Sequence, residues 1–96
     1  MIEIRETEIY SRWFGRLRDR QARAKINIRI RRLSLGNPGE VKAVGEGVSE
    51  LKLNFGSGYR VYFTQVGKEI VILLVGGDKS SQEQDIALAK KLAREI

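Results

Sequence analysis

The chain has 96 residues, of which 42% are hydrophobic and 31% are charged, a composition typical of one small globular domain spanning residues 1–96. It contains no cysteine and no histidine, which excludes disulfides, zinc sites built from those residues, and mechanisms that need a Cys nucleophile or a His base. The net charge is +6, and residues 1–35 carry the whole excess, with ten Lys and Arg against four Asp and Glu. Such an excess favours an acidic partner, either nucleic acid or a protein segment, although a solvated helix surface would give the same composition.

The amino-terminal sequence has no leader-like apolar segment before its charged residues. No apolar run elsewhere approaches the ~18–20 residues that a membrane-spanning helix needs. We therefore expect a cytoplasmic protein that is neither secreted nor embedded in a membrane.

The first third of the chain predicts one strand and a basic helical hairpin. Residues 2–5 alternate between apolar and charged side chains, as in a short strand. Thr7 is suited to cap a first helix. The apolar residues of that helix recur every four positions, at Ile9, Trp13 and Leu17. After a break at residues 19–21, a second helical stripe consists of Ala22, Ile26, Ile30 and Leu33. The turn at residues 36–39 holds the only proline and ends this helix.

The middle of the chain predicts an antiparallel meander. Strands are expected at residues 42–44, in two runs within residues 49–63 that flank a glycine-rich turn, and at residues 69–75. The last run is apolar on both faces, so it should be an interior strand that is covered on both sides. Because the loops are short and no βαβ alternation occurs, neighbouring strands should be antiparallel.

The hairpin within residues 49–63 presents a candidate phosphate-binding face. Its apolar face should pack on the core and contains Leu51, Leu53, Phe55, Tyr59, Val61 and Phe63. The opposite face carries Lys52, Arg60 and Tyr62, and we expect it to be exposed to solvent. Two cations and a phenol on an open sheet are suited to holding a phosphate. The alternative is that Arg60 and Lys52 pair with a neighbouring carboxylate across the strands.

The glycine-rich segment after the last strand is a second candidate anion site. Residues 76–80 lack the spacing of a Walker A loop, so nucleotide hydrolysis is not expected. A Gly-Gly bend before a helix exposes backbone N–H groups, and Lys79 beside it suits an anion, although a plain strand-to-helix connection is the alternative. Asp78 or a serine should cap the final helix, whose stripe contains Ile86, Ala89, Ala93 and Ile96. The nearby carboxylates do not predict a metal site, and no cofactor is expected.

Several segments, in order along nearly the whole chain, carry a family resemblance. They are Trp13 with residues 16–19, and residues 29–33, 36–39, 47–52, 58–63 and 76–82. Together they resemble the RelE/ParE toxin superfamily, and more narrowly its HigB-like branch of addiction-module killer or phage Gp49-like proteins. The resemblance implies an α+β fold, with a small antiparallel β-sheet, an N-terminal helical hairpin and a C-terminal helix.

The resemblance also implies a toxin that a cognate antitoxin neutralises, here expected to be a helix-turn-helix protein. Toxins of the RelE and HigB types cleave mRNA on the ribosome, which predicts a metal-free, ribosome-dependent endoribonuclease that arrests translation. Toxins of the ParE type instead inhibit DNA gyrase, which is the alternative. A degenerate toxin that is kept only as a binding module is a third hypothesis.

The resemblance assigns roles to individual positions. Arg60 matches the strand arginine that contacts the scissile phosphate in RelE-like nucleases. Lys52 resembles the basic residue on the preceding strand, and Lys79 lies where these nucleases often have a further basic residue. Many members also have a Tyr or His near the C-terminus as acid or base, but residues 89–96 contain neither. The proton-transfer group would then be one of Lys52, Tyr62, Gln82 or Glu50, or catalysis would rest mainly on charge stabilisation.

The mechanism that these residues favour is attack of a ribose 2′-OH on its own 3′-phosphate, with preorganised cations stabilising the charge on the phosphate. Arg60 is suited to a bidentate grip on that phosphate. A guanidinium of Arg60 that is buried in the interior, or distant from both lysines, would contradict the nuclease hypothesis and favour a protein-binding role.

Overall fold

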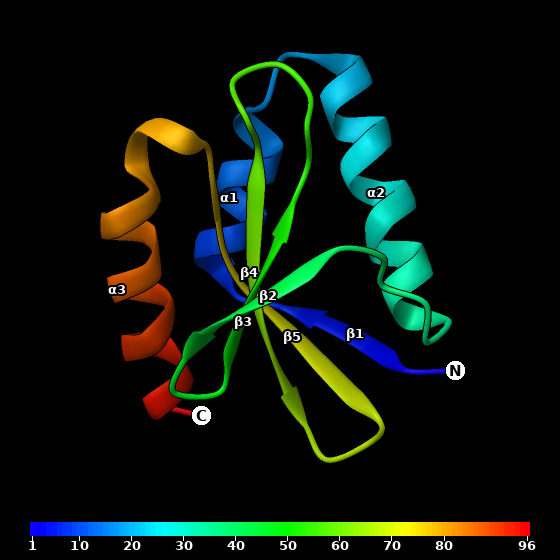
Figure 1. Ribbon diagram of the computed structural model, residues 1–96, viewed down its shortest axis with the longest axis vertical. Helices are drawn as coiled ribbons and strands as arrows, with labels where there is room; N and C mark the ends of the chain where they lie inside the picture. The colour runs from blue at the N-terminus through cyan, green and yellow to red at the C-terminus, as the bar shows by residue number, and fades with distance from the viewer.

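The computed structural model describes all 96 residues and has an α+β fold, as the sequence predicts (Figure 1). In chain order the elements are β1 (Glu3–Glu6), α1 (Glu8–Arg16), α2 (Arg20–Ser34), β2 (Val41–Gly45), β3 (Val48–Lys52), β4 (Arg60–Val66), β5 (Ile70–Gly77), the short 3₁₀ turn η1 (Lys79–Ser81) and α3 (Gln82–Arg94). The helical hairpin near the N-terminus and the C-terminal helix are both confirmed.

The five strands form one sheet in the order β1-β5-β4-β3-β2. Strands β2 to β5 are an antiparallel meander, as predicted. Strand β1 differs, because it pairs in parallel with β5 and makes the sheet mixed. The alternation of residues 2–5 predicts a strand but not its direction. In the structure β1 lies at the edge of the sheet beside β5, and the backbone N–H of Glu3 donates to the carbonyl of Glu69 at 2.7 Å.

Helices cover both faces of the sheet (Figure 1). Helices α1 and α2 close one face over the larger apolar cluster, which includes Tyr10, Ile26, Leu51 and Val61. Helix α3 closes the other face over a smaller cluster of Val48, Tyr62, Leu74, Val75 and Ala89. Residues of β5 contribute to both clusters, so the prediction of an interior strand covered on both sides is confirmed.

Polar side chains mark where the helices begin. The Thr7 hydroxyl accepts the N–H of Tyr10 at 3.0 Å and donates to the carbonyl of Leu74 at 2.6 Å, so it caps α1 and ties it to β5. Asp19 caps α2. Asp78 caps η1 instead of α3, and Ser81 precedes α3 without a side-chain hydrogen bond. The predicted cap therefore lies one short turn earlier than expected.

At Gly76 and Gly77 the side chains of two helices lie directly against the backbone of the sheet. A methyl group on Gly76 would overlap the ring of Trp13 in α1, and one on Gly77 would overlap the carboxylate of Asp85 in α3. Both glycines lie inside β5 and are buried. They are therefore required by packing, because any larger side chain would force a helix away from the sheet.

We predict that Gly76→Ala lowers the free energy of unfolding by about 1–3 kcal/mol, the usual effect of overpacking a dense core. Gly15→Ala in α1 is the matched control, because nothing lies within 4 Å of the added methyl. It should raise stability by about 0.5–1 kcal/mol, since alanine is the better helix former. Urea denaturation of both variants measures this, and equal stability of Gly76→Ala and the wild type would contradict the packing argument.

Candidate functional site

The three predicted cations meet at the loop end of the β3–β4 hairpin. Lys52 ends β3 and lies directly opposite Arg60, which begins β4. The backbone N–H of Lys79 donates to the carbonyl of Ser57 at 3.3 Å, which holds η1 against the loop between the two strands. A methyl on Gly58 would lie 3.4 Å from Arg60 Nη1 and 3.5 Å from Lys79 Cβ. The side chains of Lys52, Arg60 and Lys79 consequently line one open cleft of about 360 Å³.

Arg60 is much less exposed than the sequence predicts. Its side chain is 6% exposed, with Nε 3.3 Å from Oε1 of Glu50 and Nη1 donating to the carbonyl of Gly58 at 2.9 Å. The prediction of a solvent-exposed Arg60 is therefore wrong, and the cross-strand pairing with a carboxylate, given as the alternative, is what the structure contains. Nη2 of Arg60 forms no hydrogen bond in the protein and is not among the buried unpartnered atoms, so this nitrogen keeps some exposure to solvent. Arg60 lines both the cleft and the smaller depression beside it.

Glu50 is the centre of a buried polar cluster. Its Oε1 accepts the amide N–H of Gln82 at 3.0 Å and the hydroxyl of Tyr62 at 3.4 Å, besides facing Arg60. The residue is 4% exposed. All of these contacts go to Oε1, whereas Oε2 has no protein partner and is not among the buried unpartnered atoms. A second depression, of about 190 Å³, is lined by Glu40, Lys42, Glu50, Lys52, Arg60 and Gln82.

Tyr62 is fully buried, so the prediction that it lies on an exposed face is also wrong. The reason is α3, which packs its own apolar residues, Ala89 among them, on that side of the sheet. Burial, and next the neighbouring carboxylate of Glu50, raise the pKa of Tyr62 well above its ordinary value. The phenol therefore stays protonated and can act on a ligand only through Glu50.

The predicted anion site at the glycine-rich segment takes a different form. Gly76 and Gly77 are paired with Val61 and Arg60 in the sheet, so they do not form an exposed bend. The N–H and the hydroxyl of Ser80 both donate to Asp78, at 2.9 and 2.6 Å. The hydrogen bond from the Ser80 side chain is the main cause that lowers the pKa of Asp78. The carboxylate of Asp78 thus takes the donors of this turn that an external anion would need. Of this segment, only the exposed side chain of Lys79 remains available to bind an anion.

Arg29 is a structural residue that the sequence does not single out. From α2 its Nη1 donates to the carbonyl of Lys52 at 2.8 Å, and its Nη2 donates to the carbonyl of Glu40 at 3.0 Å. It therefore fixes the backbone on which Lys52 stands. In the sequence Arg29 is one of many arginines on a basic helix, and nothing in the pattern separates it from its exposed neighbours.

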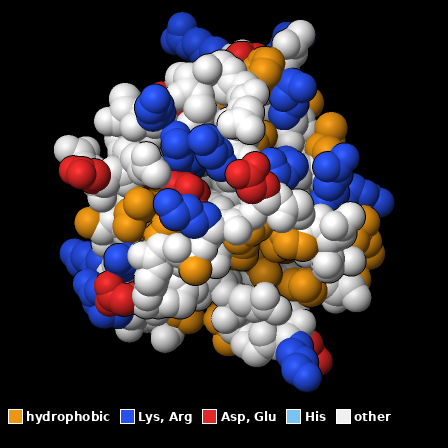
Figure 2. Space-filling view, in the orientation of Figure 1, with side chains coloured by type: hydrophobic (Ala, Val, Ile, Leu, Met, Phe, Trp, Pro, Cys, Tyr) orange, Lys and Arg blue, Asp and Glu red, His pale blue; other side chains and the backbone are white.

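Basic side chains predominate over acidic ones on the upper half of the face shown in Figure 2. The largest depression, of about 850 Å³, lies at the corner between α1 and α2. Its lining is Gly15, Arg16, Leu17, Arg18, Arg20 and Arg23, so it contains none of the predicted site residues. No group of three or more Asp and Glu side chains is arranged to hold a metal ion. No helix has both the length and the apolar character to cross a membrane.

Comparisons with known proteins assign the family. Residues 12–94 match the model of the family described as phage-derived protein Gp49-like (DUF891). An uncharacterized protein of Haemophilus influenzae is 47% identical over 95 residues, which are 99% of this chain and 96% of that protein. The chain therefore belongs to the Gp49-like family of phage-derived proteins. This family is toxin-like, and membership is consistent with a toxin of a toxin–antitoxin system that has an antitoxin as its partner.

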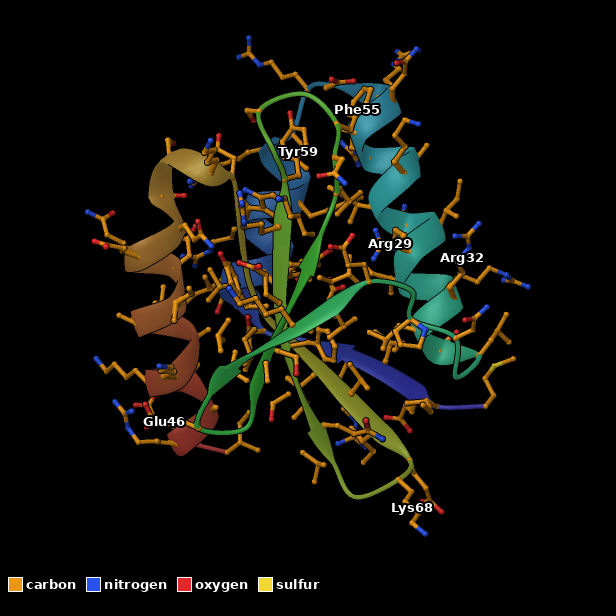
Figure 3. The ribbon with its side chains drawn as sticks, viewed as in Figure 1. Arg29, Arg32, Glu46, Phe55, Tyr59 and Lys68 are labelled. Atoms are coloured by element: carbon orange, nitrogen blue, oxygen red, sulfur yellow. The ribbon has the colours of Figure 1, made fainter.

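We predict that Glu50→Gln lowers the free energy of unfolding by about 3 kcal/mol, because the charge of Arg60 then stays buried without a counter-ion. Glu46→Gln is the matched control. Glu46 pairs with Arg94 at 2.8 Å at the surface, beside the end of α3 (Figure 3), so its loss should change stability by less than about 1 kcal/mol. Adding Arg60→Met to Glu50→Gln should restore most of the loss. Chemical denaturation measures all three, and equal effects of the two glutamate variants would contradict the buried pair.

A second prediction concerns alkaline pH. Burial also raises the pKa of Tyr10, so two tyrosines keep their protons in the folded chain at a pH where the unfolded chain loses them. Stability should be unaffected below pH ~10, the ordinary tyrosine pKa, and should fall as the pH rises above it. The double variant Tyr10→Phe/Tyr62→Phe should show a shallower fall. Denaturant midpoints between pH 8 and 11 measure this, and equal slopes would contradict it.

Proposed function

We propose that this protein is the toxin of a toxin–antitoxin pair and that it arrests translation by cleaving mRNA on the ribosome without a metal ion. The observation that supports this most is the cleft in which Lys52, Arg60 and Lys79 lie together. In this proposal the toxin acts in the cytoplasm, and its neutralising partner is a helix-turn-helix antitoxin.

The proposed chemistry is transfer of the phosphate to the neighbouring 2′-oxygen. In this proposal the scissile phosphate lies where the cleft meets the smaller depression that Glu50 lines, since Lys52 and Arg60 line both. The 2′-OH attacks phosphorus, its proton passes to Oε2 of Glu50, and the bond to the 5′-oxygen breaks. The ammonium of Lys52 or Lys79 supplies the proton that the leaving 5′-oxygen needs. Negative charge that develops on the phosphate oxygens is stabilised by the cations of the cleft.

The buried pair changes the roles that the sequence suggests. Nη1 of Arg60 already donates one hydrogen bond to Gly58, so Nη2 is the nitrogen that has no partner in the protein and is offered to a phosphate. Glu50 becomes the proton acceptor because Oε2 has no partner in the protein. Gln82 and Tyr62 act by holding Oε1 of Glu50 and thereby orienting the carboxylate.

The alternative is a toxin that inhibits DNA gyrase by binding and cleaves nothing. One observation favours it. Arg60 is almost fully buried and paired with Glu50, which is how a purely structural ion pair would look. A buried Arg60 is also one of the two results that we expected to contradict the nuclease hypothesis. The other, a large distance between Arg60 and both lysines, is not observed, because all three line one cleft.

Induction of the toxin without its antitoxin, followed by mapping of mRNA 5′ ends, tests the proposal. Wild-type induction should produce new ends within ribosome-bound messages. Broken or relaxed DNA without new mRNA ends would favour gyrase inhibition, and normal growth would contradict both functions and leave a binding module.

The double variant Lys52→Gln/Lys79→Gln should reduce cleavage about 100-fold or more, because each cation stabilises charge in the transition state. Lys68→Gln/Lys91→Gln is its control, since both residues are exposed and line none of the depressions. Tyr62→Phe should reduce cleavage only a few-fold, because Gln82 still holds Oε1 of Glu50 at 3.0 Å when the 3.4 Å contact of the phenol is lost. Arg60→Ala is a poorer test, because it strands the carboxylate of Glu50 in the interior. Normal cleavage by the folded Lys52/Lys79 variant would contradict the assignment.

A further inference from the structure

A second groove lies next to the proposed cleft. It has a volume of about 340 Å³ and is lined by Lys25, Ile28, Arg29, Arg32, Leu53, Asn54 and Phe55. Asn54 and Phe55 also line the cleft of Lys52, Arg60 and Lys79, so the two depressions adjoin at these two residues. Figure 3 shows Phe55 beside the first turns of α2, with Arg29 and Arg32 further along the helix. A chain that leaves the cleft across the β3–β4 loop therefore enters this groove.

Helix α2 presents an ordered set of side chains to the groove. Its four lining residues have the spacing i, i+3, i+4 and i+7, which places them on one face of the helix. Arg29 is engaged with backbone carbonyls, whereas Lys25 and Arg32 form no ion pair. Ile28 between them is 54% exposed.

Phe55 supplies the aromatic surface of the groove. The ring is partly exposed, and Nζ of Lys25 lies 5.1 Å from its centroid. A ring that is partly open to solvent and faces a cation is suited to stack against a nucleobase, while the cation moves to the phosphate beside that base. Base stacking of this kind requires an unpaired base, which single-stranded RNA provides.

We propose that this groove is a second nucleotide subsite, in which single-stranded RNA that continues from the cleft stacks one base on Phe55 and places its phosphates on Lys25 and Arg32. The inference rests on the proposed function and names the flanking contacts of the same site. The groove is continuous with the cleft through Asn54 and Phe55. One RNA strand could therefore occupy both, whereas an acidic peptide in the groove would have no role in the proposed cleavage, so we favour RNA as the occupant.

The test is binding of a 2′-O-methyl oligoribonucleotide, which cannot be cleaved, to the purified chain by fluorescence anisotropy at several salt concentrations. Lys25→Gln/Arg32→Gln should weaken binding about 10-fold at low salt. It should also reduce the slope of log K against log salt by about 1.4, because each lost phosphate contact with a single strand contributes about 0.7. The control Lys68→Gln/Lys91→Gln should change the slope by much less.

Phe55→Ala should weaken binding about 10-fold with the salt slope unchanged, and Phe55→Trp should restore it, because stacking is independent of charge. Thermal melting of each variant checks its folding. If Phe55→Ala unfolds, the binding and salt dependence of Lys25→Gln/Arg32→Gln, whose side chains are exposed, test the subsite on their own. Wild-type affinity in both groove variants, with binding lost in Lys52→Gln/Lys79→Gln, would overturn the subsite and leave the proposed nuclease standing.

Two further outcomes would overturn the subsite in other ways. If the wild type binds no oligoribonucleotide but binds an acidic amphipathic peptide that Lys25→Gln/Arg32→Gln weakens, the groove is a protein-docking surface. If the wild type neither binds RNA nor produces new mRNA ends in cells, the proposed function fails together with the subsite.

Discussion

The arrangement of the site depends on one constraint, which is that helices close both faces of a small sheet. Once α3 covers the second face, Glu50, Arg60 and Tyr62 on that side are buried and can no longer be fully solvated. The charges of Glu50 and Arg60 must then compensate one another, because an unpaired buried charge is strongly destabilising, although Nε of Arg60 forms no hydrogen bond with the carboxylate. Tyr62 and Gln82 complete the arrangement by donating to the same carboxylate oxygen. The polar cluster therefore joins the central hairpin to the C-terminal helix.

This constraint also sets what the site can do. An arginine on an open sheet could bind a phosphate through two parallel donors, but it would be free to move. The pairing with Glu50 and Gly58 removes that freedom and leaves one nitrogen, Nη2, without a partner in the protein. The guanidinium offers fewer contacts, yet it is fixed before a ligand arrives, and such preorganisation is what electrostatic catalysis requires. The same geometry would also serve a site that only binds.

The sequence predicts the elements better than their surroundings. Alternation along β3 and β4 identifies two faces and assigns Leu51 and Val61 to the core correctly. It cannot show that the opposite face is covered, since the stripe on α3 indicates an apolar surface but not what it packs against. For the same reason Gly76 and Gly77 suggest a flexible bend, although they are required because Trp13 and Asp85 lie against them. Arg29 escapes prediction because its partners are backbone carbonyls, which carry no sequence signal.

The basic excess of the first third is divided among different tasks. Arg29 is used inside the fold and Arg12 pairs with Glu8, whereas Arg16, Arg18 and Arg20 are exposed without carboxylate partners. Unpaired like charges on one side repel each other and destabilise the folded chain, so a polyanion bound on that side would reduce this electrostatic repulsion. If RNA uses the groove beside Phe55, an acidic antitoxin segment lying on α2 would compete for the same cations. Neutralisation would then need no contact with Arg60, because excluding the RNA strand from its path is sufficient.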